Sequence, residues 1–75
     1  MAMSKEGDET LEILTWQART EKGLTLYQLQ ELTGISKTTL NDIENGKTSP
    51  TLNQLEIIAR ALHVHITDLF QSDIK

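Results

Sequence analysis

A short segment near the middle of the chain places side chains with hydrogen-bonding groups on one side. They are Lys37, Thr38, Asn41 and Asp42. If the segment is helical, each residue advances about 100° around the axis, so these side chains share one arc while Leu40 and Ile43 share the other. Threonine, asparagine and aspartate are mediocre helix formers, which argues against a merely solvated helix face. They can instead offer directional hydrogen bonds to the edges of nucleic-acid bases.

The residues before this segment predict another helix, joined to it by a tight turn. Thr25 and Gln28 have the spacing of a capping box, which predicts that a helix begins there. Gly34 can end that helix in the left-handed conformation, and Ser36 is a suitable N-cap for a helix over residues 37–45. Two helices separated by a few residues that include a glycine form a helix-turn-helix.

The rest of the chain carries apolar residues at helical spacing, which predicts a scaffold of further helices. We expect a first helix over residues 8–22, a fourth that begins after Thr51 at a second capping box, and a short fifth over residues 66–71. Trp16 is expected to pack beside the apolar stripe of the first helix. The expected core residues of the whole bundle are Leu11, Leu14, Thr15, Ala18, Leu29, Leu32, Leu52, Leu55, Ile58, Ala59, Leu62, Leu69 and Phe70. No strand pattern or repeat is visible. The predicted fold is therefore all-α, a compact bundle of five short helices.

Length and composition limit the function classes. The 75 residues fit one domain, predicted over residues 8–75, after a flexible N-terminal segment at residues 1–7. The chain has no cysteine and no apolar run long enough for a membrane span, so we expect a cytoplasmic protein. His63 and His65 are two positions apart, which does not place both on one helix face for a metal ion. No nucleophile with an assigned base is visible, so we expect no enzyme, catalytic residue, metal or cofactor.

Residues 23–50 read G-L-T-x3-L-x4-G-I-S-x3-L-x2-I-E-N-G-K-x2-P, and residues 58–62 read I-A-R-A-L. With these motifs the chain resembles the lambda-repressor-like helix-turn-helix family, also called the XRE family of bacterial and phage regulators, over about residues 11–70. The resemblance implies a DNA-binding domain whose second and third helices form the helix-turn-helix. It also implies transcriptional regulation, of repressor type, through sequence-specific binding to double-stranded DNA. Phage repressor, restriction-modification controller and chromosomal regulator remain open subtypes.

The resemblance also implies which side chains contact DNA. The helix over residues 37–45 would enter the major groove, with Lys37 facing guanine, Thr38 a thymine methyl group and Asn41 adenine. Asp42 holds a base-facing position and could accept from cytosine, although a solvated or intra-protein role is equally open because its charge repels phosphate. The expected phosphate contacts are the backbone amides at the helix starts of Thr25 and Ser36, together with Gln28, Asn45 and Lys47. Each of these also has a structural explanation as a cap, a helix stop or a solvated charge.

Glu44 is expected to form an ion pair. Its helical position lies beside Leu40, on the side expected to be buried, where a lone carboxylate is costly. In the family the matching glutamate pairs with an arginine of the first helix, which corresponds to Arg19 here. We therefore predict an ion pair between Arg19 and Glu44 with a structural role.

Three positions depart from the family pattern. Leu26 stands where a glutamine usually contacts phosphate, so that contact is missing or is replaced by Tyr27 or Gln28. Gln30 replaces an alanine where the two motif helices meet, so either their crossing is looser or the amide points outward. His63 replaces a glycine after the fourth helix and would be strained in a left-handed backbone conformation.

The expected assembly is a homodimer on a palindromic site. One helix of about nine residues spans only about 13 Å and reads few base pairs, whereas two helices about 34 Å apart read both halves of a palindrome. The candidate dimer contacts are Ile57, Ala61, Ile66, Phe70 and Ile74. Ile66 and Phe70 could equally complete the core of a monomer.

Net charge supports an alternative partner. Eleven acidic and seven basic residues give a formal charge of −4, whereas DNA-binding proteins usually carry a basic patch. Much of the acid lies outside the motif, so DNA remains the expected partner, with few phosphate contacts and a shallow salt dependence. The alternative is a protein-interaction module on the same scaffold, such as an antitoxin that binds a partner protein.

Overall fold

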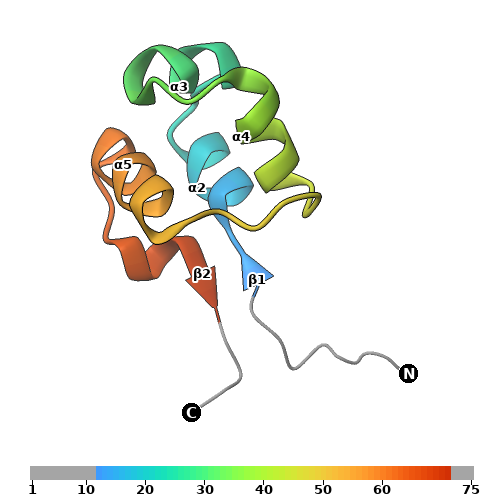
Figure 1. The fold of residues 1–75 in the computed structure, drawn as a ribbon. Helices are drawn as coiled ribbons and strands as arrows, with labels where there is room; N and C mark the ends of the chain where they lie inside the picture. Colours follow the sequence, from blue (N-terminus) through green and yellow to red (C-terminus); the bar gives the residue numbers. More distant parts are fainter. Residues whose placement is uncertain (1–11, 72–75) are drawn as a thin grey trace.

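The computed structural model describes residues 12–71, and its main elements are helices. They are β1 (Glu12–Ile13), α2 (Thr15–Glu21), α3 (Leu26–Thr33), α4 (Lys37–Glu44), α5 (Leu52–Leu62), the 3-10 helix η1 (Ile66–Leu69) and β2 (Phe70–Gln71). Figure 1 shows α3 and α4 at one end of the domain and the two short strands, which begin and end the described residues, at the other. The predictions for Leu11, for Ile74 and for the flexible segment at residues 1–7 fall outside the described residues.

Side-chain caps begin three of the helices where the sequence predicts. Thr25 and Thr51 each form a complete capping box, in which the threonine hydroxyl accepts from the third helical amide and a glutamine side chain accepts from the threonine amide. The Ser36 hydroxyl accepts from the amide of Thr39 at 3.1 Å. Gly34 ends α3 with a φ of 76°, the left-handed conformation that glycine adopts without a Cβ clash.

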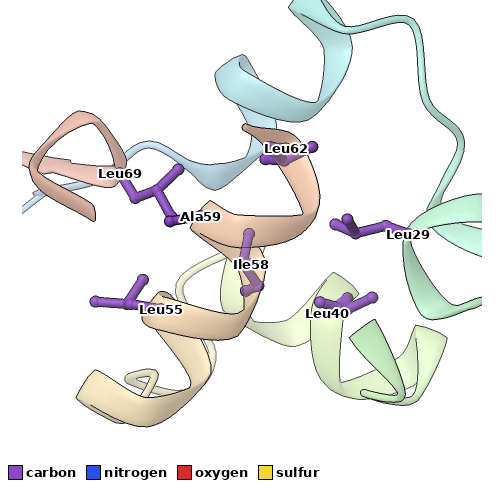
Figure 2. Close-up of a cluster of buried hydrophobic side chains, with 7 residues drawn as sticks. All are labelled: Leu29, Leu40, Leu55, Ile58, Ala59, Leu62 and Leu69. Atoms are coloured by element: carbon purple, nitrogen blue, oxygen red, sulfur yellow. The ribbon is translucent and has the colours of Figure 1, made fainter. Parts of the chain in front are cut away.

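Apolar side chains from four elements form the core, with α5 at its centre. The cluster contains Leu29, Leu40, Leu55, Ile58, Ala59, Leu62 and Leu69. Figure 2 shows Leu29 of α3 and Leu40 of α4 approaching Ile58 and Leu62 of α5. Full burial of one such leucine or isoleucine side chain stabilises a fold by about 1.5–3 kcal/mol. Because Leu40 and Ile43 are both buried, α4 is held with its apolar arc inward.

The first and last elements differ from the prediction. Residues 12–14 are not helical, because Glu12 and Ile13 pair antiparallel with Gln71 and Phe70. Helix α2 therefore begins only at Thr15, and the predicted fifth helix is a 3-10 helix that stops at Leu69. The predicted bundle of five short helices is confirmed in part, because four of them are α-helices and the fifth is a 3-10 helix, but the expectation of no strands was wrong. The backbone groups of the strands find partners far away in the sequence rather than one helical turn away. The described part contains four α-helices, one 3-10 helix and a two-stranded sheet.

Some apolar residues expected in the core are exposed. Trp16, Leu32 and Leu52 keep 53%, 58% and 73% of their surfaces accessible. Trp16 follows buried Thr15 by one position, about 100° around α2, and so turns away from the core. Leu52 is the first residue of α5, and the core begins one turn later. Leu32 lies in the last turn of α3, beyond Leu29, so the packing predicted for these three side chains was wrong.

Candidate nucleic-acid interface

Helix α4 presents a polar surface to solvent. Lys37, Thr38 and Asn41 are exposed, and Asp42 is half-buried. On the opposite arc Leu40 and Ile43 are only 2% and 1% exposed. Burial of the apolar arc therefore turns three hydrogen-bonding side chains outward along one helix face. Asp42 is more shielded from solvent than these three.

The start of α3 leaves two backbone amides for an external acceptor. The capping box already occupies the amides of Thr25 and Gln28, because Gln28 Oε1 accepts from Thr25 at 2.8 Å and Thr25 Oγ1 accepts from Gln28 at 3.0 Å. Within residues 12–71, the amides of Leu26 and Tyr27 have no partner. Amides at a helix start can bind phosphate oxygen, so these two are better candidates than the amides of the cap itself.

At the start of α3, a contact with phosphate would have to use other side chains than in the family, because Leu26 replaces the usual glutamine. Leu26 is half-buried and packs against the core, so it cannot project toward a phosphate. Tyr27 is 60% exposed, and both Thr25 and Gln28 are exposed. The oxygen of Gln28 serves the capping box, which leaves its amide nitrogen as the group able to donate outward.

At the start of α4, more of the backbone amides have hydrogen-bond partners within the protein than at the start of α3. Ser36 accepts from Thr39, and Gln30 Oε1 accepts from the backbone amide of Lys37 at 2.6 Å. Of the first three helical amides, only that of Thr38 has no partner in the described part of the chain. The Gln30 bond was not predicted. The sequence signal for this bond was the glutamine at a position where the family usually has alanine. The side-chain amide of Gln30 turns toward α4 rather than simply outward.

The end of α4 combines a helix stop with exposed polar groups. Asn45 is the C-cap residue, and Gly46 follows it with a φ of 76°. The Lys47 amide donates to the carbonyl of Asp42 at 2.8 Å, which holds the turn against the helix. The backbones of Asn45 and Lys47 take part in ending the helix. Their side chains are exposed, so both remain able to contact DNA.

The ion pair between Arg19 and Glu44 fixes the end of α4 to α2. Arg19 Nε donates to Glu44 Oε2 at 2.6 Å, and Arg19 Nη2 donates to Oε1 at 2.9 Å. The remaining guanidinium nitrogen, Nη1, donates to the carbonyl of Leu24 at 2.8 Å. The hydrogen bonding that Arg19 donates to the Glu44 carboxylate raises the pKa of Arg19 above its ordinary value, and partial burial opposes that rise. Both side chains are largely shielded, with 12% and 4% exposed.

The residues predicted at a dimer contact have different surroundings. Ala61, Ile66 and Phe70 are half-buried and pack against the core of their own chain. Ile57 is half-buried but does not belong to that set, and Ile74 lies outside the described residues. Of these five positions, Ile57 is therefore the described one whose apolar surface the core uses least.

Comparison with known proteins identifies the fold. A family model described as helix-turn-helix matches residues 17–69, from within α2 to the end of η1. The chain belongs to the XRE-type helix-turn-helix family of transcriptional regulators. It is 43% identical over 56 residues to an uncharacterized HTH-type transcriptional regulator of Methanothermobacter thermautotrophicus, an alignment that covers 73% of this chain and 81% of the relative.

A second relative of this XRE-type chain is the HTH-type transcriptional regulator SutR of Escherichia coli. The two are 44% identical over 48 residues, which cover 64% of this chain but 27% of SutR. The family implies DNA binding and regulation rather than enzymatic catalysis. In residues 12–71 no group of three histidine, cysteine or acidic side chains is placed to hold a metal ion, and no helix there is long and apolar enough to cross a membrane.

Proposed function

We propose that this regulator binds a specific double-stranded DNA sequence by inserting α4 into the major groove, in the manner of a repressor. The observation that carries the proposal is the division of α4 into two faces. Leu40 and Ile43 are buried, whereas Lys37, Thr38 and Asn41 are exposed along the other arc. A helix of this kind fits the major groove, and its exposed groups match the hydrogen-bonding patterns of base edges.

Each exposed side chain has a different preferred base contact. Lys37 can donate to the O6 and N7 atoms of guanine, Thr38 can contact a thymine methyl group, and Asn41 can bond both edge groups of adenine. Asp42 is half-buried, so in this proposal it has the smallest part in base recognition. The base contact that Asp42 could make is a hydrogen bond accepted from cytosine N4.

Phosphate contacts would position α4 without specifying sequence. The amides of Leu26, Tyr27 and Thr38, which have no partner within residues 12–71, can bind phosphate oxygens beside the groove. The exposed side chains of Thr25, Gln28, Ser36, Asn45 and Lys47 flank these amides in the sequence or follow α4. Because lysine supplies the only cation among those five side chains, and the whole chain has a formal charge of −4, we expect a shallow dependence of affinity on salt.

A homodimer would supply the length of contact that one short helix lacks. Two α4 helices related by a two-fold axis would read a palindrome with half-sites about 34 Å apart. Ile57 of α5 is the described residue best suited to an isologous contact, because Ala61, Ile66 and Phe70 already pack against their own core. For localisation we propose the cytoplasm, because a DNA-binding regulator must share a compartment with DNA. The cysteine-free sequence also led us to expect a reducing cytoplasm.

The proposal is tested by selection from random duplexes, with sequencing of the bound fraction. We expect enrichment of a palindrome whose half-sites each contain a few strongly preferred base pairs. The selection should be repeated at low salt, where nonspecific attraction to DNA is strongest. If no sequence is enriched at either salt concentration, sequence-specific binding is excluded.

Two observations favour a second function, that of a protein-interaction module such as an antitoxin. Leu26 packs against the core where the family usually has a phosphate-contacting glutamine, and the chain is acidic. Under this alternative the exposed face of α4 would not read bases. The same selection separates the two functions, because a protein-only module would leave the duplex pool unchanged.

A further inference from the structure

Gln30 connects the two helices of the helix-turn-helix through a directional contact. It lies on α3, next to the fully buried Leu29, and is itself half-buried. Its Oε1 atom accepts from the backbone amide of Lys37, the first residue of α4, at 2.6 Å. This amide is one of the helix-start donors that no carbonyl of α4 can satisfy, so the glutamine caps α4 from a neighbouring helix.

The bond differs in kind from the other contacts between α3 and α4. Leu29 and Leu40 join these helices through apolar packing, which has no directional preference and tolerates small rotations. The Ser36 cap lies within the same segment as α4 and so does not orient α4 against α3. A short hydrogen bond constrains both distance and angle.

Helix α4 is therefore held at both ends by side chains of other helices. Arg19 of α2 holds Glu44 at its last residue, and Gln30 of α3 holds Lys37 at its first. In residues 12–71 these are the side-chain hydrogen bonds that reach α4 from another helix. Loss of the Gln30 bond would free the first turn, while Glu44 would still fix the last.

We propose that Gln30 is a positioning residue that sets the base preference of the first turn of α4. It acts by anchoring the amide of Lys37 to α3, and so fixes the direction in which the side chains of Lys37 and Thr38 leave the protein. The inference rests on the proposed function, because it concerns how α4 reads DNA. Its effect should be largest at the base pair that faces Lys37 and smaller toward the last turn.

The test compares three variants in the same duplex selection. Gln30→Met keeps the length of the side chain but lacks the acceptor, and Gln30→Glu keeps an acceptor oxygen. Gln54→Met is the matched control, because Gln54 Oε1 accepts from a backbone amide in the same way, but at the start of α5. Amide hydrogen exchange at Lys37 and unfolding in urea are measured on each protein without DNA.

We expect Gln30→Met to exchange the Lys37 amide about tenfold faster and to lose about three- to tenfold of the preference at the base pair facing Lys37. The Gln30→Glu variant should retain that preference, with weaker overall affinity because its charge repels phosphate. The Gln54→Met control should lose some stability and keep every base preference. A structural role alone would lower affinity for all sequences equally.

Unchanged Lys37 exchange in Gln30→Met would overturn the inference. So would an unaltered base preference in that variant when the wild-type chain enriches a clear sequence. If the wild-type chain enriches no duplex, the proposed function and the inference fail together. When the inference fails alone, the wild-type chain enriches a sequence, but Gln30→Met keeps the wild-type Lys37 exchange or the wild-type base preference.

Discussion

Arg19 and Glu44 bind each other through two parallel hydrogen bonds, although they lie 25 positions apart in the sequence. Their side chains are 12% and 4% exposed, so removal of one partner leaves the other charge largely shielded from water. We expect Arg19→Met to lower the free energy of unfolding by about 3 kcal/mol, because the Glu44 carboxylate then lacks its partner. Urea denaturation followed by circular dichroism measures this change.

The double variant Arg19→Met/Glu44→Met controls for the loss of packing. It removes both charges, so we expect it to be more stable than Arg19→Met alone by at least about 1 kcal/mol. Equal stability of the single and double variants would contradict a structural role for the ion pair.

His63 adopts the left-handed conformation at the C-cap of α5, with φ 58° and ψ 45°. In the described part of the chain it is the one residue other than glycine with a positive φ. Because glycine has no Cβ to clash, we expect His63→Gly to raise the free energy of unfolding by about 0.5–1 kcal/mol. His63→Ala keeps the Cβ and should bring no such gain, and a melting temperature of His63→Gly at or below that of the wild type would disprove the strain.

Thr15 is buried, with 1% of its surface exposed, and its hydroxyl has no hydrogen-bond partner within residues 12–71. We expect Thr15→Val to raise the free energy of unfolding by about 1 kcal/mol, since it removes an unsatisfied polar atom and keeps the shape. Thr33→Val is the matched control, because the Thr33 hydroxyl donates to the Leu29 carbonyl and accepts from the Ile35 amide. That control should lose about 1 kcal/mol. Equal losses in both variants would show that Thr15 has a partner.

Ile57 offers the cleanest test of the proposed dimer. It lies half-buried on α5 outside the set of residues that pack against the core. We expect Ile57→Asp to shift the wild-type dimer toward monomer by at least about tenfold in dissociation constant, since a charge then enters the contact. Sedimentation equilibrium measures the shift, with Ile57→Val as the control. A wild-type chain that stays monomeric at high concentration would remove the dimer from the account.

Local signals in the sequence predicted the helix-turn-helix well. The capping boxes at Thr25 and Thr51, the N-cap at Ser36 and the left-handed residue at Gly34 depend on neighbours within a few positions, and the structure contains all of them. The buried arc of α4 follows from helical periodicity in the same way. The partner of Glu44 was not predictable from spacing alone, and it came from the family resemblance.

Other features set by distant contacts were not predicted. Glu12 and Ile13 join Gln71 and Phe70 in strands of two residues, too short to show an alternating pattern. The Gln30 bond to α4 depends on the crossing of two helices, which the sequence does not specify. The contacts with DNA stay predictions, and they are based on the exposure of the side chains on α4.

The most direct test of base reading by α4 is a comparison of two asparagine variants in the duplex selection. Asn41 is exposed on α4, and Asn53 is an exposed asparagine near the start of α5. We expect Asn41→Ala to lose about 1–3 kcal/mol of discrimination at one base pair in each half-site, while Asn53→Ala keeps the wild-type preferences. Identical base preferences in Asn41→Ala and the wild type, at equal folded stability, would contradict the account.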